Sequence, residues 1–146
     1  MKKLMVGLLA CLALAALRAS ESDWMTDLSK AQAKAKAEKK LVLMDFTGSD
    51  WCPPCMKLKS EVFATTEFAD YAKKNLVLVE LDFPRKKQQS AEQKQANQAL
   101  ASKYKVEAYP TIIVLNAEGK KIDELVGYQP GGPKPFLERL EKLKGK

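Results

Sequence analysis

Two cysteines, Cys52 and Cys55, constrain this chain more than any other feature of its sequence. They flank two prolines. An apolar run typical of a buried strand comes before them (41–46), and a run with apolar residues at helical spacing comes after them (56–63). We therefore expect the pair to lie where a strand ends and a helix begins. There the unpaired backbone N–H groups and the helix dipole favour a thiolate, and proline fits the first helical positions. Since a thiolate is the form that attacks disulfides, the placement predicts redox chemistry.

A Cys-x-x-Cys pair has two other common uses, a zinc site and a static disulfide. Zinc normally takes four Cys or His ligands, but the chain has no histidine, and its third cysteine is Cys11 near the N-terminus. A static disulfide between such close residues closes too small a loop to stabilise much. We therefore favour a redox-active pair and expect no metal and no cofactor. The lack of histidine also excludes Ser-His and Cys-His catalytic pairs.

The N-terminal residues 1–20 have the pattern of a signal peptide. A basic start is followed by an apolar run (4–17) that is too short for a comfortable membrane span, and then by small residues. The sequence Leu-Leu-Ala-Cys ending at Cys11 also matches a lipidation motif, although the apolar run continues past it. We expect the leader to be removed and the protein to be periplasmic or secreted, with lipidation of Cys11 as the less favoured alternative. Disulfides can persist in that environment.

The formal net charge of +7 raises the question of nucleic-acid binding. Some of the cations lie in the leader, and most of the other lysines alternate with acidic residues and alanines on predicted helical faces. This distribution favours a solvated basic surface, so we expect no nucleic-acid partner. The chain shows no internal repeat, and its length predicts one domain over residues 21–146.

Periodicity predicts alternating helices and strands along this domain. The expected helices are 24–40, 56–63, 65–75, a polar stretch with a helical face (85–104) and 133–144, and the expected strands are 41–46, 76–82, 111–115 and 120–126. This order indicates an α/β fold with a mixed four-stranded sheet and helices on both faces. Residues 85–98 are rich in Gln and Lys, so we expect them to form a solvated helix or a mobile connection.

Two residues beside the cysteines each allow two interpretations. Asp45 interrupts an apolar strand: it either points to the strand edge and caps the next turn, or it is a buried acid near the dithiol with a raised pKa that moves protons during exchange. Trp51 either covers the disulfide and offers a flat apolar surface to a partner, or it packs as an ordinary aromatic residue.

Several of these residues together resemble the thioredoxin family. They include Asp45 with Phe46, the Trp-Cys-Pro-Pro-Cys motif, Val106, Tyr109-Pro110-Thr111 at the start of a strand, Glu118-Gly119-Lys120 in the next hairpin, and Gly127. The region around the motif is similar to secreted bacterial thioredoxin-like proteins, among them the reducing domain of the periplasmic disulfide-reductase system. The resemblance covers essentially the whole predicted domain. It implies a thioredoxin fold with an extra N-terminal helix and a polar helical insertion at 85–98.

The resemblance also implies roles for individual residues. Cys52 would be the attacking thiolate and Cys55 the buried resolving thiol. The Tyr109–Pro110 bond would be cis, and the backbone of Tyr109 would pair with a bound peptide as an added strand. Without the resemblance, Pro110 is consistent with a trans proline at the start of an edge strand.

Two departures from the family pattern bear on the proton-relay role of Asp45. One extra residue separates Asp45 from Cys52, and Leu78 stands where the family has a lysine that pairs with the buried acid.

The predicted activity is extracytoplasmic thiol–disulfide exchange on protein disulfides, with a membrane or periplasmic redox partner that recycles the pair. Pro53 and Pro54 supply neither charge nor an N–H to stabilise a thiolate, so we expect a moderately reducing protein. The alternatives are an oxidant that introduces disulfides, and a thioredoxin-fold binding or assembly module in which the dithiol is incidental. No exposed apolar helix is evident in the sequence, which favours a monomer.

Overall fold

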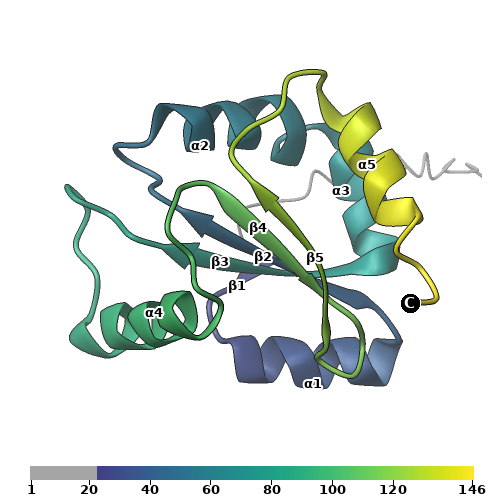
Figure 1. Ribbon diagram of the computed structural model, residues 1–146, viewed down its shortest axis with the longest axis horizontal. Helices are drawn as coiled ribbons and strands as arrows, with labels where there is room; N and C mark the ends of the chain where they lie inside the picture. The colour runs from purple at the N-terminus through teal and green to yellow at the C-terminus, as the bar shows by residue number, and fades with distance from the viewer. Residues whose placement is uncertain (1–22) are drawn as a thin grey trace, which may run out of the picture.

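The computed structural model describes residues 23–146 (Figure 1). The strands are β1 (Trp24–Met25), β2 (Leu41–Thr47), β3 (Leu76–Asp82), β4 (Thr111–Leu115) and β5 (Lys121–Val126). The helices are α1 (Leu28–Glu38), α2 (Pro53–Leu58), the π-helical turn η2 (Lys59–Phe63), α3 (Thr66–Asn75), α4 (Ala91–Lys103) and α5 (Pro133–Glu141). The predicted leader, with Cys11, lies outside the described residues. Within residues 23–146, no helix has the length and apolar character needed to cross a membrane.

The strands form one mixed sheet in the order β1-β3-β2-β4-β5. The pairings of β3 with β1 and with β2 are parallel, whereas β4 is antiparallel to both β2 and β5. All seven residues of β2 are buried, which explains its nearly continuous apolar sequence at the centre of the sheet. The predicted α/β architecture with a mixed sheet is confirmed.

Helices cover both faces of the sheet, as predicted (Figure 1). One apolar cluster joins the sheet to α2, η2, α3 and α5, and the other joins it to α1 and α4. Alternate residues of β2 contribute to the two clusters: Leu43 belongs to the first, and Met44 and Phe46 belong to the second. Because side chains alternate along a strand, Asp45 faces the same side as Leu43, toward α2 and η2.

The N-terminal prediction is wrong in its details. A helix from Trp24 and a four-stranded sheet were expected, but Trp24 lies in β1 opposite Leu78 of β3, which makes a fifth strand. The indole packs on Phe63 and Phe68, with ring centres 5.0 and 6.4 Å away. Helix α1 begins only at Leu28, where the Asp27 carboxylate caps the backbone N–H of Lys30. A two-residue strand has no periodicity from which it could have been predicted.

The prediction of a solvated helix in the polar stretch 85–98 is confirmed for residues 91–98, which are helical and mostly exposed. Its first residues belong to the loop between β3 and α4 (83–90), and the helix begins after the capping residue Ser90. Helix α4 connects β3 to β4, and Asn97 and Ala101 are its buried residues. The Asn97 amide donates to the carbonyl oxygen of Asp82 at 2.9 Å. The contact between helix and sheet is therefore narrow and partly polar, which is why the sequence shows so weak an apolar face.

Candidate active site

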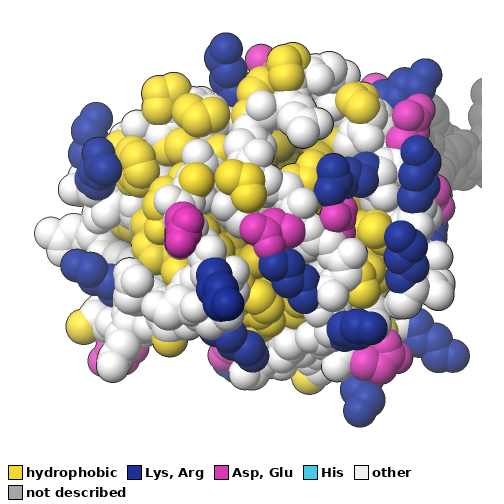
Figure 2. Space-filling model, in the orientation of Figure 1, with side chains coloured by type: hydrophobic (Ala, Val, Ile, Leu, Met, Phe, Trp, Pro, Cys, Tyr) yellow, Lys and Arg dark blue, Asp and Glu magenta, His cyan; other side chains and the backbone are white. Residues whose placement is uncertain are grey.

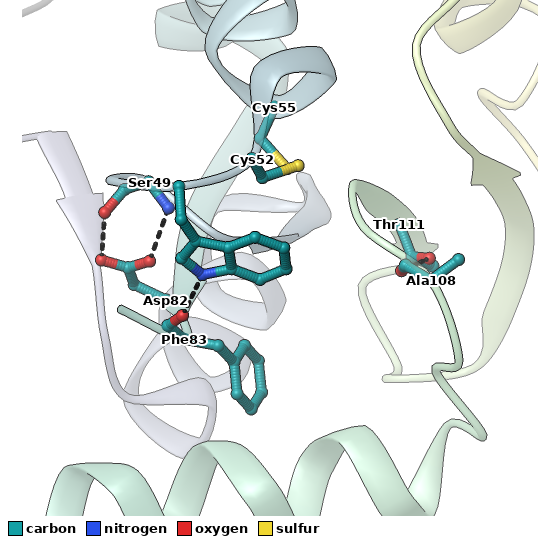
Figure 3. The surroundings of a disulfide bond; sticks show 8 residues. Ser49, Cys52, Cys55, Asp82, Phe83, Ala108 and Thr111 are labelled. Atoms are coloured by element: carbon teal, nitrogen blue, oxygen red, sulfur yellow. Dashed lines mark hydrogen bonds between the residues drawn. A yellow bond between two sulfur atoms is a disulfide. The ribbon is translucent and has the colours of Figure 1, made fainter. Parts of the chain in front are cut away.

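The cysteine pair lies at the predicted junction of strand and helix. Cys52 is the N-cap of α2, prolines occupy the first helical positions, and a disulfide joins Cys52 to Cys55 across 5.3 Å between Cα atoms (Figure 3). Both side chains are buried. The backbone N–H of Cys52 donates to the carbonyl of Gly48 at 2.9 Å, which closes the turn between β2 and α2. This arrangement aims the helix dipole at the first cysteine, as the sequence predicts.

The indole of Trp51 is fixed beside the disulfide by three kinds of contact. Its Nε1–H donates to the carbonyl of Phe83 at 2.7 Å, the dashed line to Phe83 in Figure 3. Its ring meets Tyr109 edge-on at 5.8 Å between centres. A Cβ on Gly48 would lie 2.7 Å from Cζ2 of the indole, so only glycine leaves room for the ring. Trp51 is therefore packed on one side and remains half-exposed on the other.

The loop before β4 comes close to the same ring. The Tyr109–Pro110 peptide bond is cis. The Tyr109 ring lies 5.2 Å from the Phe83 ring, and its burial raises the pKa of the phenol. The carbonyl of Pro110 accepts from the N–H of Gly127 at 2.8 Å, which ties this loop to the end of β5. Trp51, Tyr109 and Pro110, which were predicted to bind substrate, are thus held on adjoining loops.

Asp45 is a buried acid and does not cap the following turn. Its side chain is 6% exposed, and Oδ1 has no hydrogen-bond partner among the described residues. Burial is the main cause of a strongly raised pKa, and the charges of Glu80 and Asp82 add to it. The turn is instead bonded by Asp82, whose carboxylate accepts from the N–H and the hydroxyl of Ser49 at 3.0 and 2.5 Å (Figure 3).

The sequence does not reveal that a cation, Lys59, lies near enough to Asp45 to affect its pKa. Leu78, at the position of the family's lysine, is buried in the apolar cluster on the α2 side of the sheet. The positive charge that partly lowers the pKa of Asp45 belongs to Lys59, at the start of η2. Nothing in the sequence predicts the π-helical turn, so the direction of Lys59 could not be inferred from helical periodicity.

A second acid, Asp50, joins the active-site turn to the β3–α4 loop. Its carboxylate accepts from the backbone N–H groups of Arg85, Lys86 and Lys87 at 2.9, 2.8 and 2.7 Å. These bonds lower the pKa of Asp50 to about 2. The sequence indicates a turn at 47–50 and suggests only that Asp50 or Ser49 accepts from backbone N–H groups of that turn. The actual partners lie 35 to 37 residues away, so no local pattern reveals them.

We expect Asp50→Ala to release the β3–α4 loop. The three N–H groups would lose their acceptor, so amide hydrogen exchange at Arg85, Lys86 and Lys87 should accelerate by about tenfold or more, the equivalent of one lost charge-assisted hydrogen bond. The matched control is Asp70→Ala on the exposed face of α3, which should leave these amides unchanged. Equal exchange in the two variants would contradict the prediction.

The hydrogen bonds accepted by Asp50 also determine how stability depends on pH. Because the pKa of Asp50 is lower in the folded protein, its contribution to stability is complete above its ordinary value of 3.8 and is lost as the pH falls toward about 2. Protection of the loop amides in the wild type should therefore fall over that range.

Comparison with known proteins identifies the family. The family model described as a thioredoxin-like domain matches residues 28–144. The chain belongs to the thioredoxin-like family. The disulfide bond reductase DsbH of Chlamydia pneumoniae is 34% identical over 125 residues, which cover 86% of this chain and 74% of that protein. The thioredoxin-related protein DsbJ of the same organism is 36% identical over 126 residues, but the match covers only 36% of its length and 82% of this chain.

A solved structure agrees with these relatives. A structure titled DsbH oxidoreductase aligns with a TM-score of 0.76 and 35% identity, over 82% of each chain. The family membership and the Cys52–Cys55 pair together make this thioredoxin-like protein a thiol–disulfide oxidoreductase.

Proposed function

We propose that this thioredoxin-like protein reduces disulfides of other proteins outside the cytoplasm. The observation that carries the proposal is the Cys52–Cys55 disulfide at the start of α2, beside an aromatic surface formed by Trp51 and Tyr109. The intervening prolines add no charge and no N–H donor, which keeps stabilisation of a thiolate moderate and favours a reducing pair. Similarity to a relative named as a disulfide bond reductase supports the same direction.

The proposed reaction begins with the dithiol form. The thiolate of Cys52 attacks one sulfur of a substrate disulfide, a mixed disulfide forms, and the other substrate sulfur leaves as a thiolate. Cys55 loses its proton and attacks Sγ of Cys52, which restores the Cys52–Cys55 bond and releases the second substrate sulfur as a thiolate. Two electrons pass from the dithiol to the substrate. We assign Asp45 to the proton transfer at Cys55, because its raised pKa and its orientation toward α2 suit that role.

Substrate would lie across Trp51 and the loop that carries Tyr109 and Pro110, with the Tyr109 backbone pairing with an extended segment. A dithiol donor, in the membrane or in the periplasm, would return the pair to its reduced form. The leader pattern of residues 1–20 supports the extracytoplasmic location, with residues 21–146 as the mature monomeric domain.

The redox potential of the Cys52–Cys55 pair tests this proposal. The purified mature protein is equilibrated in glutathione or dithiothreitol buffers, and the oxidised fraction is followed by thiol alkylation. We expect a value near the roughly −270 mV of thioredoxins, whereas a value near the roughly −120 mV of strong oxidants would assign disulfide formation instead. The absence of a reversible two-electron couple would leave only a binding module.

A further inference from the structure

The loop between β3 and α4 carries three consecutive cations, Arg85, Lys86 and Lys87, all of them exposed. This loop and the start of α2 lie at the same end of the sheet, because β2 and β3 are parallel and both end there (Figure 1). The Asp50 carboxylate holds the loop by hydrogen bonds to three backbone N–H groups, and the charge of Lys87 also acts on it. The loop is therefore fixed next to the redox pair by its backbone, and the side chains of Arg85 and Lys86 take no part in the bonds to Asp50.

Two of the three charges remain available to a partner. Lys87 pairs with Asp82 at 3.6 Å, whereas Arg85 and Lys86 form no ion pair within the part of the chain that the structure describes. The Arg85 guanidinium carbon lies 3.7 Å from the centre of the Trp51 ring. Stacking on an aromatic face orders a guanidinium while its N–H groups stay free to meet a carboxylate. Arg85 thus extends the Trp51 surface with a positive charge.

Exposed apolar side chains lie on segments at the same end of the sheet, where Thr111 pairs with both Phe46 and Val126. Among the described residues, the large hydrophobic side chains that are exposed are Met56 (43%) and Val126 (57%). Met56 follows Cys55, and Val126 precedes Gly127, which is bonded to Pro110. In Figure 2, hydrophobic side chains gather over the α2 end of the molecule, with Lys and Arg side chains along its margin. On the facing loop before Tyr109, the charged residues are one acid, Glu107, and one cation, Lys105.

We propose that the β3–α4 loop selects protein substrates that carry acidic residues next to the reactive disulfide. The inference rests on the proposed function and specifies the class of partner. Apolar contacts at Met56, Trp51 and Val126 would hold the segment, and Arg85 and Lys86 would attract its carboxylates. Attraction between exposed opposite charges at the edge of a binding surface acts mainly by accelerating the encounter of protein and substrate, and salt screens this attraction.

The test compares two model peptides that each contain one disulfide. Their sequences differ only in that the residues flanking the cysteines are Asp and Glu in one peptide and Asn and Gln in the other. Oxidation of the reduced protein by each peptide gives a second-order rate constant, which is divided by the rate constant for the same peptide with dithiothreitol. This division removes the intrinsic effect of acidic neighbours on the sulfur chemistry.

We expect the wild type to prefer the acidic peptide by about three- to tenfold at low salt, as two exposed charge pairs would give. The preference should fall toward unity in about 0.5 M NaCl. The double variant Arg85→Gln/Lys86→Gln should lose it, and the matched control Lys34→Gln/Lys36→Gln, on exposed positions of α1, should keep it.

Equal normalised rate constants in the wild type would overturn the inference, and so would a preference that survives in Arg85→Gln/Lys86→Gln. If both peptides are reduced at equal normalised rates, the proposed reductase function still stands and only the selection of acidic substrates is refuted. If neither peptide is reduced, that function fails, and the inference fails with it.

Discussion

Replacing Cys52 by serine is expected to abolish disulfide reduction, with a fall of at least about a thousandfold in the rate of insulin reduction. The serine hydroxyl does not ionise at neutral pH, so it supplies no nucleophile at the start of α2, and no mixed disulfide can form. The residual rate should equal that of the protein-free buffer. If the variant reduces insulin at a substantial fraction of the wild-type rate, Cys52 is not the attacking residue.

The matched variant Cys55→Ser separates the two sulfurs. It keeps the proposed nucleophile and removes the resolving thiol, so the first step should proceed and the reaction should stop at a mixed disulfide. Mass spectrometry should then show substrate attached at Cys52. If only Cys52→Ser accumulates such an adduct, the proposed roles of the two cysteines are reversed.

Replacing Asp45 by asparagine is expected to stabilise the protein at alkaline pH. The pKa of Asp45 is raised in the folded state, mainly by burial, so the folded protein holds the proton more tightly than the unfolded chain does. The wild type therefore loses stability as the pH rises above the ordinary carboxyl value, until the folded carboxyl itself ionises. Asparagine has nearly the same shape and no charge, so the free energy of unfolding at pH 8 should rise by about 2 kcal/mol.

Denaturant unfolding of the oxidised protein at several pH values measures this effect. The difference between Asp45→Asn and the wild type should shrink toward zero as the pH falls below the ordinary carboxyl pKa of 3.8, where Asp45 is protonated in both the folded and the unfolded protein. Asp70→Asn, on the exposed face of α3, is the control and should show little difference at pH 8. A constant difference at all pH values would show that packing, and not the charge, is responsible.

The same variant also tests the proposed proton transfer. If Asp45 accepts the proton of Cys55, Asp45→Asn should slow resolution of the mixed disulfide while its formation at Cys52 is largely retained. A slower first step with normal resolution would assign Asp45 to a different step.

The sequence was sufficient to predict the parts of this fold that depend on local patterns. Strand β3 occupies the predicted residues 76–82, because an apolar run bounded by polar residues on one side and Phe83-Pro84 on the other defines both of its ends. The position of the cysteine pair follows from the change of periodicity around it. The mixed sheet with helices on both faces follows from the order of these elements.

The features of the fold and the site that the sequence did not predict depend on contacts between distant segments or on small changes in backbone bonding. Strand β1 is too short to have a pattern of its own and exists because Trp24 and Met25 pair with β3. The π-helical turn that begins at Lys59 is a small shift of backbone bonding that side-chain spacing does not encode. The bonds from Asp50 to the β3–α4 loop depend on the parallel pairing of β2 with β3, which brings two loops together.

Asp50 bonds to peptide N–H groups, which every residue except proline carries. The path of the β3–α4 loop and the charge that it displays are therefore determined by different atoms. Substitution of Lys86 can therefore remove a positive charge from the loop while the bonds from Asp50 to the backbone remain, provided that the new residue is not proline. Changes at Arg85 and Lys87 would in addition remove the stacking on Trp51 and the ion pair with Asp82, so Lys86 is the position at which the charge of the loop can be altered with the least effect on its structure.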